Sequence, residues 1–236
     1  MHIPLRVHSV YSRGKGGATL EELSWWAAHK KVPAVALSDA GNIYGWAKWK
    51  RAAKVGGFRA LYGCEIEVGE ELFLFLVKSR EGYGNLMEIL NRRAIRDAAG
   101  LVTIHVPRPK EGKTAPEPNG GHLPLDPLRA GGDLYVGADF FNFKRAGEIA
   151  AARGLPLVWA NPLKFIKGPE RLVLLHAFEK KIPYPPEWVK FGRKVRLFGP
   201  DQETAALKKF GAEATDAFRR TFEIAEKCDF PFAGIV

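Results

Sequence analysis

Three side chains in the first third of the chain have the chemistry to bind a divalent metal or to carry a proton: His8, Asp39 and Glu65. The apolar run at 35–37 leads into Asp39, and a helical pattern follows it, which predicts that Asp39 ends a buried strand. In α/β proteins, reactive side chains usually lie at that end of a parallel strand. Residues 37–45 are therefore the centre of the candidate site.

Each of the three residues also has a purely structural interpretation. Asp39 could order a turn or cap the next helix, because it stands just before a glycine and an asparagine. A lone histidine such as His8 is typical of a hydrogen-bonded core residue. Glu65 could form an ion pair with Arg6, an interpretation that we prefer to metal binding. The residue types alone do not choose between these alternatives.

The elements that must position these residues alternate between strand and helix patterns. Strands are expected at 3–8, 35–39, 60–68, 72–78, 134–137 and 157–160, and residues 195–198 are expected to be extended. Helices are expected after a capping box at 19–22, then at 42–54, 82–95, 143–153, 171–180 and 213–228. In the first strand, the two-residue period places Leu5 and Val7 on one face and Arg6 and His8 on the other. The alternation predicts a parallel sheet, and the periodicity does not distinguish a closed barrel from an open sheet.

Composition and length favour one domain over residues 1–236. The 46% hydrophobic content is typical of a packed interior, and six prolines at 107–127 predict a surface loop or insertion there. Residues 183–188 are expected to be a proline-bounded connector. No apolar run of 18 residues and no secretory signal are present, so we expect a cytoplasmic protein without membrane contact. The formal net charge of +10 suggests a polyanionic neighbour, with DNA as one candidate.

Several segments together resemble a known family. Within residues 5–12, the stretch Arg-Val-His-Ser-Val-Tyr-Ser resembles the family pattern His-x-His-Ser-x-Tyr-Ser. Residues 38–45, Ser-Asp-Ala-Gly-Asn-Ile-Tyr-Gly, resemble the pattern Thr-Asp-His-Gly-Asn-x-x-Gly, and residues 63–65 are Gly-Cys-Glu. Stretches at 77–86, 157–161 and 221–228 fit in the same order. These motifs are similar to those of the PHP (polymerase and histidinol phosphatase) domain at the N-terminus of the bacterial DNA polymerase III α subunit. The resemblance implies a distorted (β/α)7 TIM-like barrel of the PHP type, with metal ligands at the C-terminal strand ends.

The sequence departs from the family's metal-binding pattern at several positions. Arg6, Ala40 and Leu72 stand where the family has histidines, and Lys164 ends a motif that normally supplies two ligands. Asp139 is a loosely aligned candidate for a further ligand. The retained His8, Asp39 and Glu65 are too few to fill two or three coordination shells. We therefore predict a degenerate site in which Arg6 pairs with Asp39 or Glu65 and Lys164 closes the group from the opposite side.

The resemblance implies a catalytically inactive PHP domain that acts as a scaffold in DNA replication or repair. Its partner would be a polymerase body or an exonuclease subunit, and no cofactor is expected beyond, at most, a single Zn, Mn or Mg ion. One alternative is a metal-dependent phosphoesterase or 3′–5′ exonuclease with a reduced site at His8, Asp39, Glu65 and Asp139. A second alternative is a DNA-binding module that uses the basic surface. The chain could be an excised domain or a free-standing paralogue.

The remaining candidates have structural interpretations. Four tryptophans at helical spacing are expected in the core or at an interface rather than as platforms for bases: Trp25, Trp26, Trp46 and Trp49. Cys64 is expected to be a buried, unreactive thiol. Five histidines without ligand spacing are expected at the surface or in packing: His2, His29, His105, His122 and His176.

Overall fold

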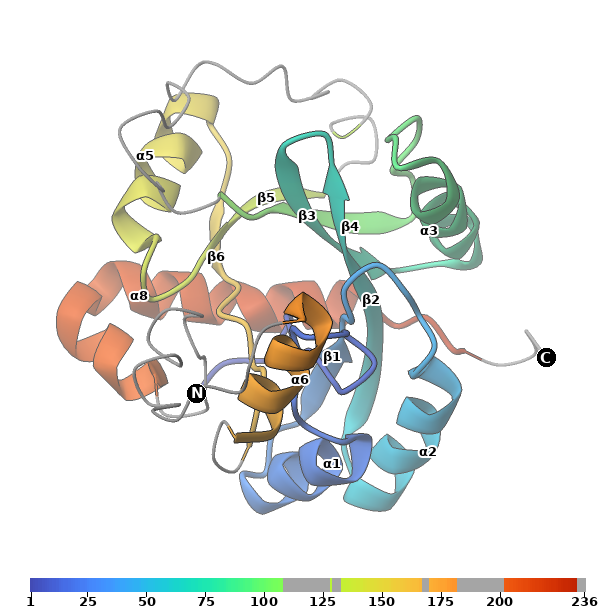
Figure 1. The fold of residues 1–236 in the computed structure, drawn as a ribbon. Helices are drawn as coiled ribbons and strands as arrows, with labels where there is room; N and C mark the ends of the chain where they lie inside the picture. Colours follow the sequence, from blue (N-terminus) through green and yellow to red (C-terminus); the bar gives the residue numbers. More distant parts are fainter. Residues whose placement is uncertain (108–127, 129–132, 167–169, 182–201, 233–236) are drawn as a thin grey trace.

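In the computed structural model, the described residues are 1–107, 128, 133–166, 170–181 and 202–232, and they contain one curled, mixed sheet (Figure 1). Its strands pair in the order of the sequence: β1 (Ala34–Leu37), β2 (Arg59–Val68), β3 (Glu71–Val77), β4 (Leu101–His105), β5 (Leu134–Ala138) and β6 (Leu157–Trp159). The β1–β2, β4–β5 and β5–β6 pairs are parallel, and β3 is antiparallel to both neighbours. The predicted α/β barrel class is confirmed.

The N-terminal segment joins the two edges of this sheet. Val7 forms parallel bridges both to Leu37 at the end of β1 and to Leu163 beyond β6. His8 N donates to Leu163 O at 2.9 Å, and Leu163 N donates to Arg6 O at 2.8 Å. Residues 3–8 therefore fill the place of a seventh strand and curl the sheet into a barrel.

This segment is less regular than the strand predicted for it. The N–H of Val7 donates to the Ser38 side chain instead of a backbone carbonyl, and Pro4 has no N–H to donate. Leu5 packs in one hydrophobic cluster and Val7 in another, so the predicted common face for these two residues is wrong. The irregular hydrogen bonding of residues 3–8 goes together with side chains that do not alternate strictly between the two faces of the segment.

Helices cover the sheet: α1 (Leu20–His29), α2 (Trp46–Gly56), α3 (Arg80–Arg92), α5 (Phe143–Arg153), α6 (Glu170–Lys180) and α8 (Gln202–Lys227). Thr19 and Glu22 form the predicted capping box of α1, and Ser79 caps α3. Non-helical backbone at Gly211 kinks α8. None of the helices in the described ranges is long and apolar enough to cross a membrane.

The barrel interior is apolar at one end, and α8 closes that end. Ile224, Ala225 and Cys228 of α8 pack with inward side chains of the strands. The Arg59 side chain at the start of β2 donates to Ala225 O at 2.7 Å. Because this end holds the starts of the parallel strands, their C-terminal ends lie at the opposite end, which we call the mouth.

Three element predictions need correction. The helix expected from residue 42 begins at Trp46, because Asn42 instead accepts from Tyr44 N and donates to backbone carbonyls in a turn. Strand β4 was not predicted, although its run Leu-Val-Thr-Ile-His is fully buried. Helix α8 begins before the predicted residue 213. The predictions at 183–188 and 195–198 and nearly all of the loop at 107–127 lie outside the described residues.

Candidate functional site at the barrel mouth

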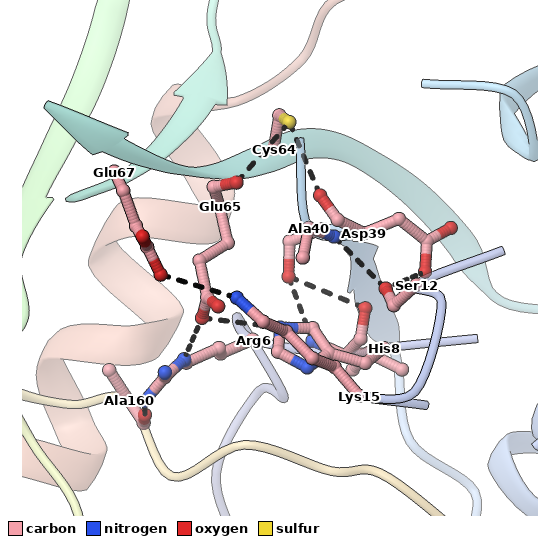
Figure 2. Close-up of polar contacts among 12 residues, drawn as sticks. Arg6, His8, Ser12, Lys15, Asp39, Ala40, Cys64, Glu65, Glu67 and Ala160 are labelled. Atoms are coloured by element: carbon pink, nitrogen blue, oxygen red, sulfur yellow. Dashed lines mark hydrogen bonds and ion pairs between the residues drawn. The ribbon is translucent and has the colours of Figure 1, made fainter. Parts of the chain in front are cut away.

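Arg6, His8, Asp39 and Glu65 meet at the mouth from three neighbouring segments (Figure 2). Asp39 follows β1, and the next residue, Ala40, forms a parallel bridge with Glu65 of β2. Arg6 and His8 come from the segment that closes the barrel. All four are buried, so their charges interact in a medium much less polar than water.

Arg6 and Glu65 form an ion pair inside the barrel. Arg6 Nε donates to Glu65 Oε2 at 2.5 Å, and the side chains are 8% and 3% exposed. Arg6 Nη1 lies 3.5 Å from the carbonyl of Ala160, at the limit of a hydrogen bond. His8 Nε2 lies 3.2 Å from the same Glu65 oxygen. One carboxylate oxygen is thus shared by a guanidinium and an imidazole.

The surroundings set the protonation of these groups. Burial raises the pKa of Glu65, but the attraction of Arg6 and His8 outweighs it and holds that pKa well below its ordinary value. Burial lowers the pKa of His8, and Glu65 offsets only part of that effect. Glu65 is therefore a carboxylate beside a permanent cation and a largely neutral imidazole. His8 Nδ1 is buried and accepts no hydrogen bond from any described residue.

Asp39 is held by hydroxyl groups rather than by Arg6. Its Oδ1 accepts from the N–H of Ser9 at 2.7 Å and from Ser12 Oγ at 2.6 Å, while Ser9 Oγ lies within 3.0 Å of both carboxylate oxygens. Ser12 Oγ also accepts from Ala40 N at 3.0 Å (Figure 2). The carboxylate thereby fixes the loop after the N-terminal segment to the end of β1.

Two glycines make this turn possible. Gly41 has φ of +70°, in the left-handed region that glycine tolerates best. A Cβ on Gly45 would lie 2.9 Å from Leu37 Cδ2 and 3.4 Å from Asp39 Oδ2. The second glycine therefore lets the chain pass close to the Asp39 carboxylate before α2 begins.

Asp139 and Lys164 are the two remaining candidates of the predicted site. Asp139 Oδ1 accepts from the N–H groups of Phe141 and Asn142 at 2.8 and 2.9 Å, so it orders the turn before α5. Burial, followed by repulsion from Arg6, lowers the pKa of Lys164 to about 8. Glu65 and Asp139 attract this lysine and raise its pKa only in part.

The contacts of these carboxylates bear on whether they could hold a metal ion. Within the described ranges, no group of three or more His, Cys, Asp or Glu side chains is arranged to hold a metal ion. Glu65 is bonded to Arg6, and the Asp39 oxygens accept from two serines. A metal bound to Glu65 Oε2 or to Asp39 Oδ1 would compete with these donors.

Comparison with known proteins identifies the family. Residues 4–111 match the family model described as PHP domain. DNA polymerase III subunit alpha of Caulobacter vibrioides is 26% identical over 280 residues, an alignment covering 97% of this chain and 23% of that protein. The Escherichia coli K12 subunit is 25% identical over 278 residues, covering 96% and 23%. The chain carries a PHP domain. It is homologous over nearly its full length to the N-terminal region of these subunits.

The chain spans about a quarter of the length of these polymerase subunits. Among solved structures, an amidohydrolase from Chromobacterium violaceum is similar with a TM-score of 0.46 and 16% identity. That alignment covers 86% of this chain and all of the other.

The PHP motifs locate some of the mouth and miss other parts. Arg6, His8 and Glu65 come together, and the predicted alternative of an Arg6–Asp39 pair is wrong because Asp39 is bound by Ser9 and Ser12. Both serines stand in the motif at residues 5–12, where the hydroxyl-rich His-Ser-x-Tyr-Ser pattern was the available signal. That the mouth is a degenerate metal site stays a prediction.

The structure places most of the other histidine, cysteine and tryptophan candidates. His105 Nε2 lies 2.6 Å from Glu71 Oε2, so the buried ring of this β4 histidine contacts a partly exposed carboxylate, which the sequence did not predict. The Cys64 thiol is buried, and burial raises its pKa to about 12, as expected for an unreactive cysteine. Trp46 and Trp49 are buried in the core, whereas Trp25 is exposed. His122 lies outside the described residues, as does the side chain of His176.

Proposed function

We propose that this chain is a catalytically inactive PHP domain of the DNA polymerase III α type, serving as a scaffold in cytoplasmic DNA replication or repair. Its partner would be a polymerase body or an exonuclease subunit. The observation that carries the proposal is the 2.5 Å contact between Arg6 Nε and Glu65 Oε2. It puts a permanent cation on a carboxylate that stands at a family ligand position.

Electrostatics explains why this contact disfavours metal catalysis. A guanidinium is not deprotonated in proteins, so Arg6 cannot become a metal ligand by losing a proton. A divalent ion at Glu65 would be repelled by Arg6 in a buried, weakly screened site. Lys164 is a second basic group at this end of the barrel, and repulsion from Arg6 lowers its pKa. A phosphoesterase or exonuclease built on His8, Asp39, Glu65 and Asp139 is the less favoured alternative.

The test measures metal content and activity on one preparation. Protein purified without chelators is expected to contain less than one Zn, Mn or Fe per chain by elemental analysis. With Mn²⁺ added, it is expected to release no nucleotide from single- or double-stranded DNA and no phosphate from a phosphomonoester. A matched variant restores the family histidines by Arg6→His, Ala40→His and Lys164→His, and is expected to bind more metal than the natural chain.

Two stoichiometric metals in the natural chain, or nuclease turnover that disappears in Asp39→Ala while the variant stays folded, would overturn the inactive assignment. The formal net charge of +10 favours one further candidate, DNA binding without catalysis. That function would show as affinity for duplex DNA that falls steeply with salt. Docking through an apolar interface would keep most of its affinity under the same conditions.

A further inference from the structure

A groove of about 550 Å³ lies between α1 and α2 on the outer surface of the barrel. Its lining includes Trp25 and Ala28 from α1 and Ala52 and Val55 from α2. Trp25 is 57% exposed and Val55 is 89% exposed. Large side chains so exposed at one concave site mark surfaces that bind other molecules more often than isolated exposed residues do.

The two helices place their tryptophans differently. Trp46 and Trp49 of α2 are 1% and 0% exposed and belong to the core, whereas Trp25 of α1 points outward. The Trp25 ring stacks on His29 one turn later, with ring centroids 5.2 Å apart and planes at 5°. This stack holds the indole in one orientation, which reduces the conformational entropy lost when a partner binds.

The rim of the groove on α2 is basic. Helix α2 contains four cations and no acidic residue: Lys48, Lys50, Arg51 and Lys54. No salt bridge joins any of the four to a carboxylate in the described part of the chain; Lys50 donates to Phe232 O at 2.7 Å, and Lys48 Nζ lies 5.7 Å from the centre of the Tyr11 ring. Lys48 and Arg51 line the groove beside its apolar floor. An occupant would therefore meet apolar surface in the middle and positive charge along one side.

We propose that the α1–α2 groove docks an acidic, amphipathic helical segment of a partner protein. An apolar side chain of that segment would pack on Trp25 and Val55, and its acidic residues would face Lys48 and Arg51. Single-stranded DNA fits less well, because Trp25 is the one aromatic ring among the residues that line the groove, whereas successive bases of a strand need successive rings to stack on. The inference rests on the proposed scaffold role and gives that role a surface and a class of partner.

The experiment uses the full chain and a displayed library of 16-residue helical peptides. Apolar residues are fixed at positions i, i+3, i+4 and i+7, and the other positions are random. Selected peptides are expected to be acidic. Trp25→Ala is expected to weaken the tightest peptide by about 30-fold, the effect of losing a central aromatic anchor. Arg51→Glu is expected to weaken it about tenfold at low salt, with a smaller effect at high salt.

Two variants outside the groove serve as controls. Phe141→Ala removes an aromatic side chain of similar exposure, 52%, near α5, and Lys144→Glu reverses an exposed charge on α5. Both are expected to leave peptide binding unchanged. Melting temperatures of all four variants check that each is folded.

The possible outcomes separate the groove from the proposed function. Selection of neutral or basic peptides, or of peptides that bind Trp25→Ala as tightly as the natural chain, would overturn the docking site. Tighter Trp25-dependent binding of a 16-nucleotide oligothymidylate than of any peptide would overturn it in favour of DNA. Nuclease turnover in the same preparation would contradict the inactive scaffold and leave the peptide result standing.

Discussion

Each end of the barrel holds a carboxylate between basic side chains, but water reaches the two ends to different degrees. At the mouth, Glu65 contacts Arg6 and His8, and all three side chains are less than one-tenth exposed. At the base, Asp133 before β5 contacts Lys78 after β3, and Lys227 of α8 at 2.6 Å. Those lysines are 23% and 43% exposed. The two carboxylates have similar partners, but the cluster at the mouth is buried, whereas water reaches the cluster at the base.

This difference changes what each cluster contributes to stability. Burial raises the pKa of Asp133, and hydrogen bonds from Lys227 and Lys78 then hold it below its ordinary value. If one lysine is lost, water and the other lysine remain beside Asp133. If Arg6 is lost, the direct side-chain contact left to Glu65 among the described residues is with the largely neutral His8. Buried pairs are therefore costly to break, whereas partly exposed pairs are not.

The largest expected effect comes from breaking the mouth pair. Arg6→Ala leaves the Glu65 carboxylate buried without its permanent cation, which should lower the free energy of unfolding by about 3–5 kcal/mol. Adding Glu65→Ala should recover part of that loss, because the uncompensated charge is then gone. Urea denaturation of the two single variants and the double variant measures the coupling.

The matched control is the same cycle with Asp39 in place of Glu65. Asp39 accepts from Ser9 and Ser12, and no contact with Arg6 is recorded for it among the described residues. The Arg6–Asp39 cycle should show a coupling near zero. Equal coupling in both cycles, or none in either, would remove the distinction drawn here between the two carboxylates.

Lys164 at the mouth and Lys227 at the base are expected to affect the stability of the fold in opposite directions. The folded pKa of Lys164 is about 8 and its ordinary value is 10.5, so between these values the unfolded chain binds more protons than the folded chain. Stability should therefore rise with pH across this window. Lys164→Met should be more stable than the natural chain at pH 7, and the difference should vanish by about pH 10.5.

Lys227 at the base should behave in the opposite way at neutral pH. Its hydrogen bonds to Asp133 and then Tyr135 raise its pKa, so its charge stabilises the folded state. Lys227→Met should therefore be less stable than the natural chain at pH 7. Denaturation of both variants from pH 7 to 10.5 makes the comparison. If the difference in stability between Lys164→Met and the natural chain stays constant with pH, the surroundings at the mouth do not lower the pKa of Lys164.

The elements of the fold were largely predictable, for a local reason. Capping residues such as Thr19 and strictly periodic stretches such as 143–153 carry their signals within a few residues. Strand β4 is as fully buried as β1 and β5, which were predicted, but Thr103 interrupts its apolar run and His105 ends it, so its pattern is weaker than theirs. The start of α2 was misplaced because Asn42 bonds to backbone groups of its own turn, a competition that propensity does not weigh.

The candidate site was predictable only in its composition. The family motifs named Arg6, His8, Asp39 and Glu65, and the barrel brings all four to one end. The motifs did not predict whether Asp39 or Glu65 pairs with Arg6. That choice depends on an irregular N-terminal segment and on Ser9 and Ser12. Hydrogen bonds between residues 27 to 59 positions apart leave no periodic signal in the sequence.

The smallest expected loss of stability is at the base, where it tests whether a partly exposed pair is weaker than the buried pair at the mouth. Lys78→Ala removes one of the two lysines on Asp133 and should lower the free energy of unfolding by about 1 kcal/mol or less, since partly exposed pairs are weak. The effect should shrink further in about 0.5 M salt, whereas the loss in Arg6→Ala should change little because ions do not screen a buried pair well. Urea denaturation at low and high salt measures both. If Lys78→Ala costs as much as Arg6→Ala, or if salt weakens the mouth pair as strongly as the base, then exposure does not separate the two ends, and the mouth pair owes its strength to geometry instead.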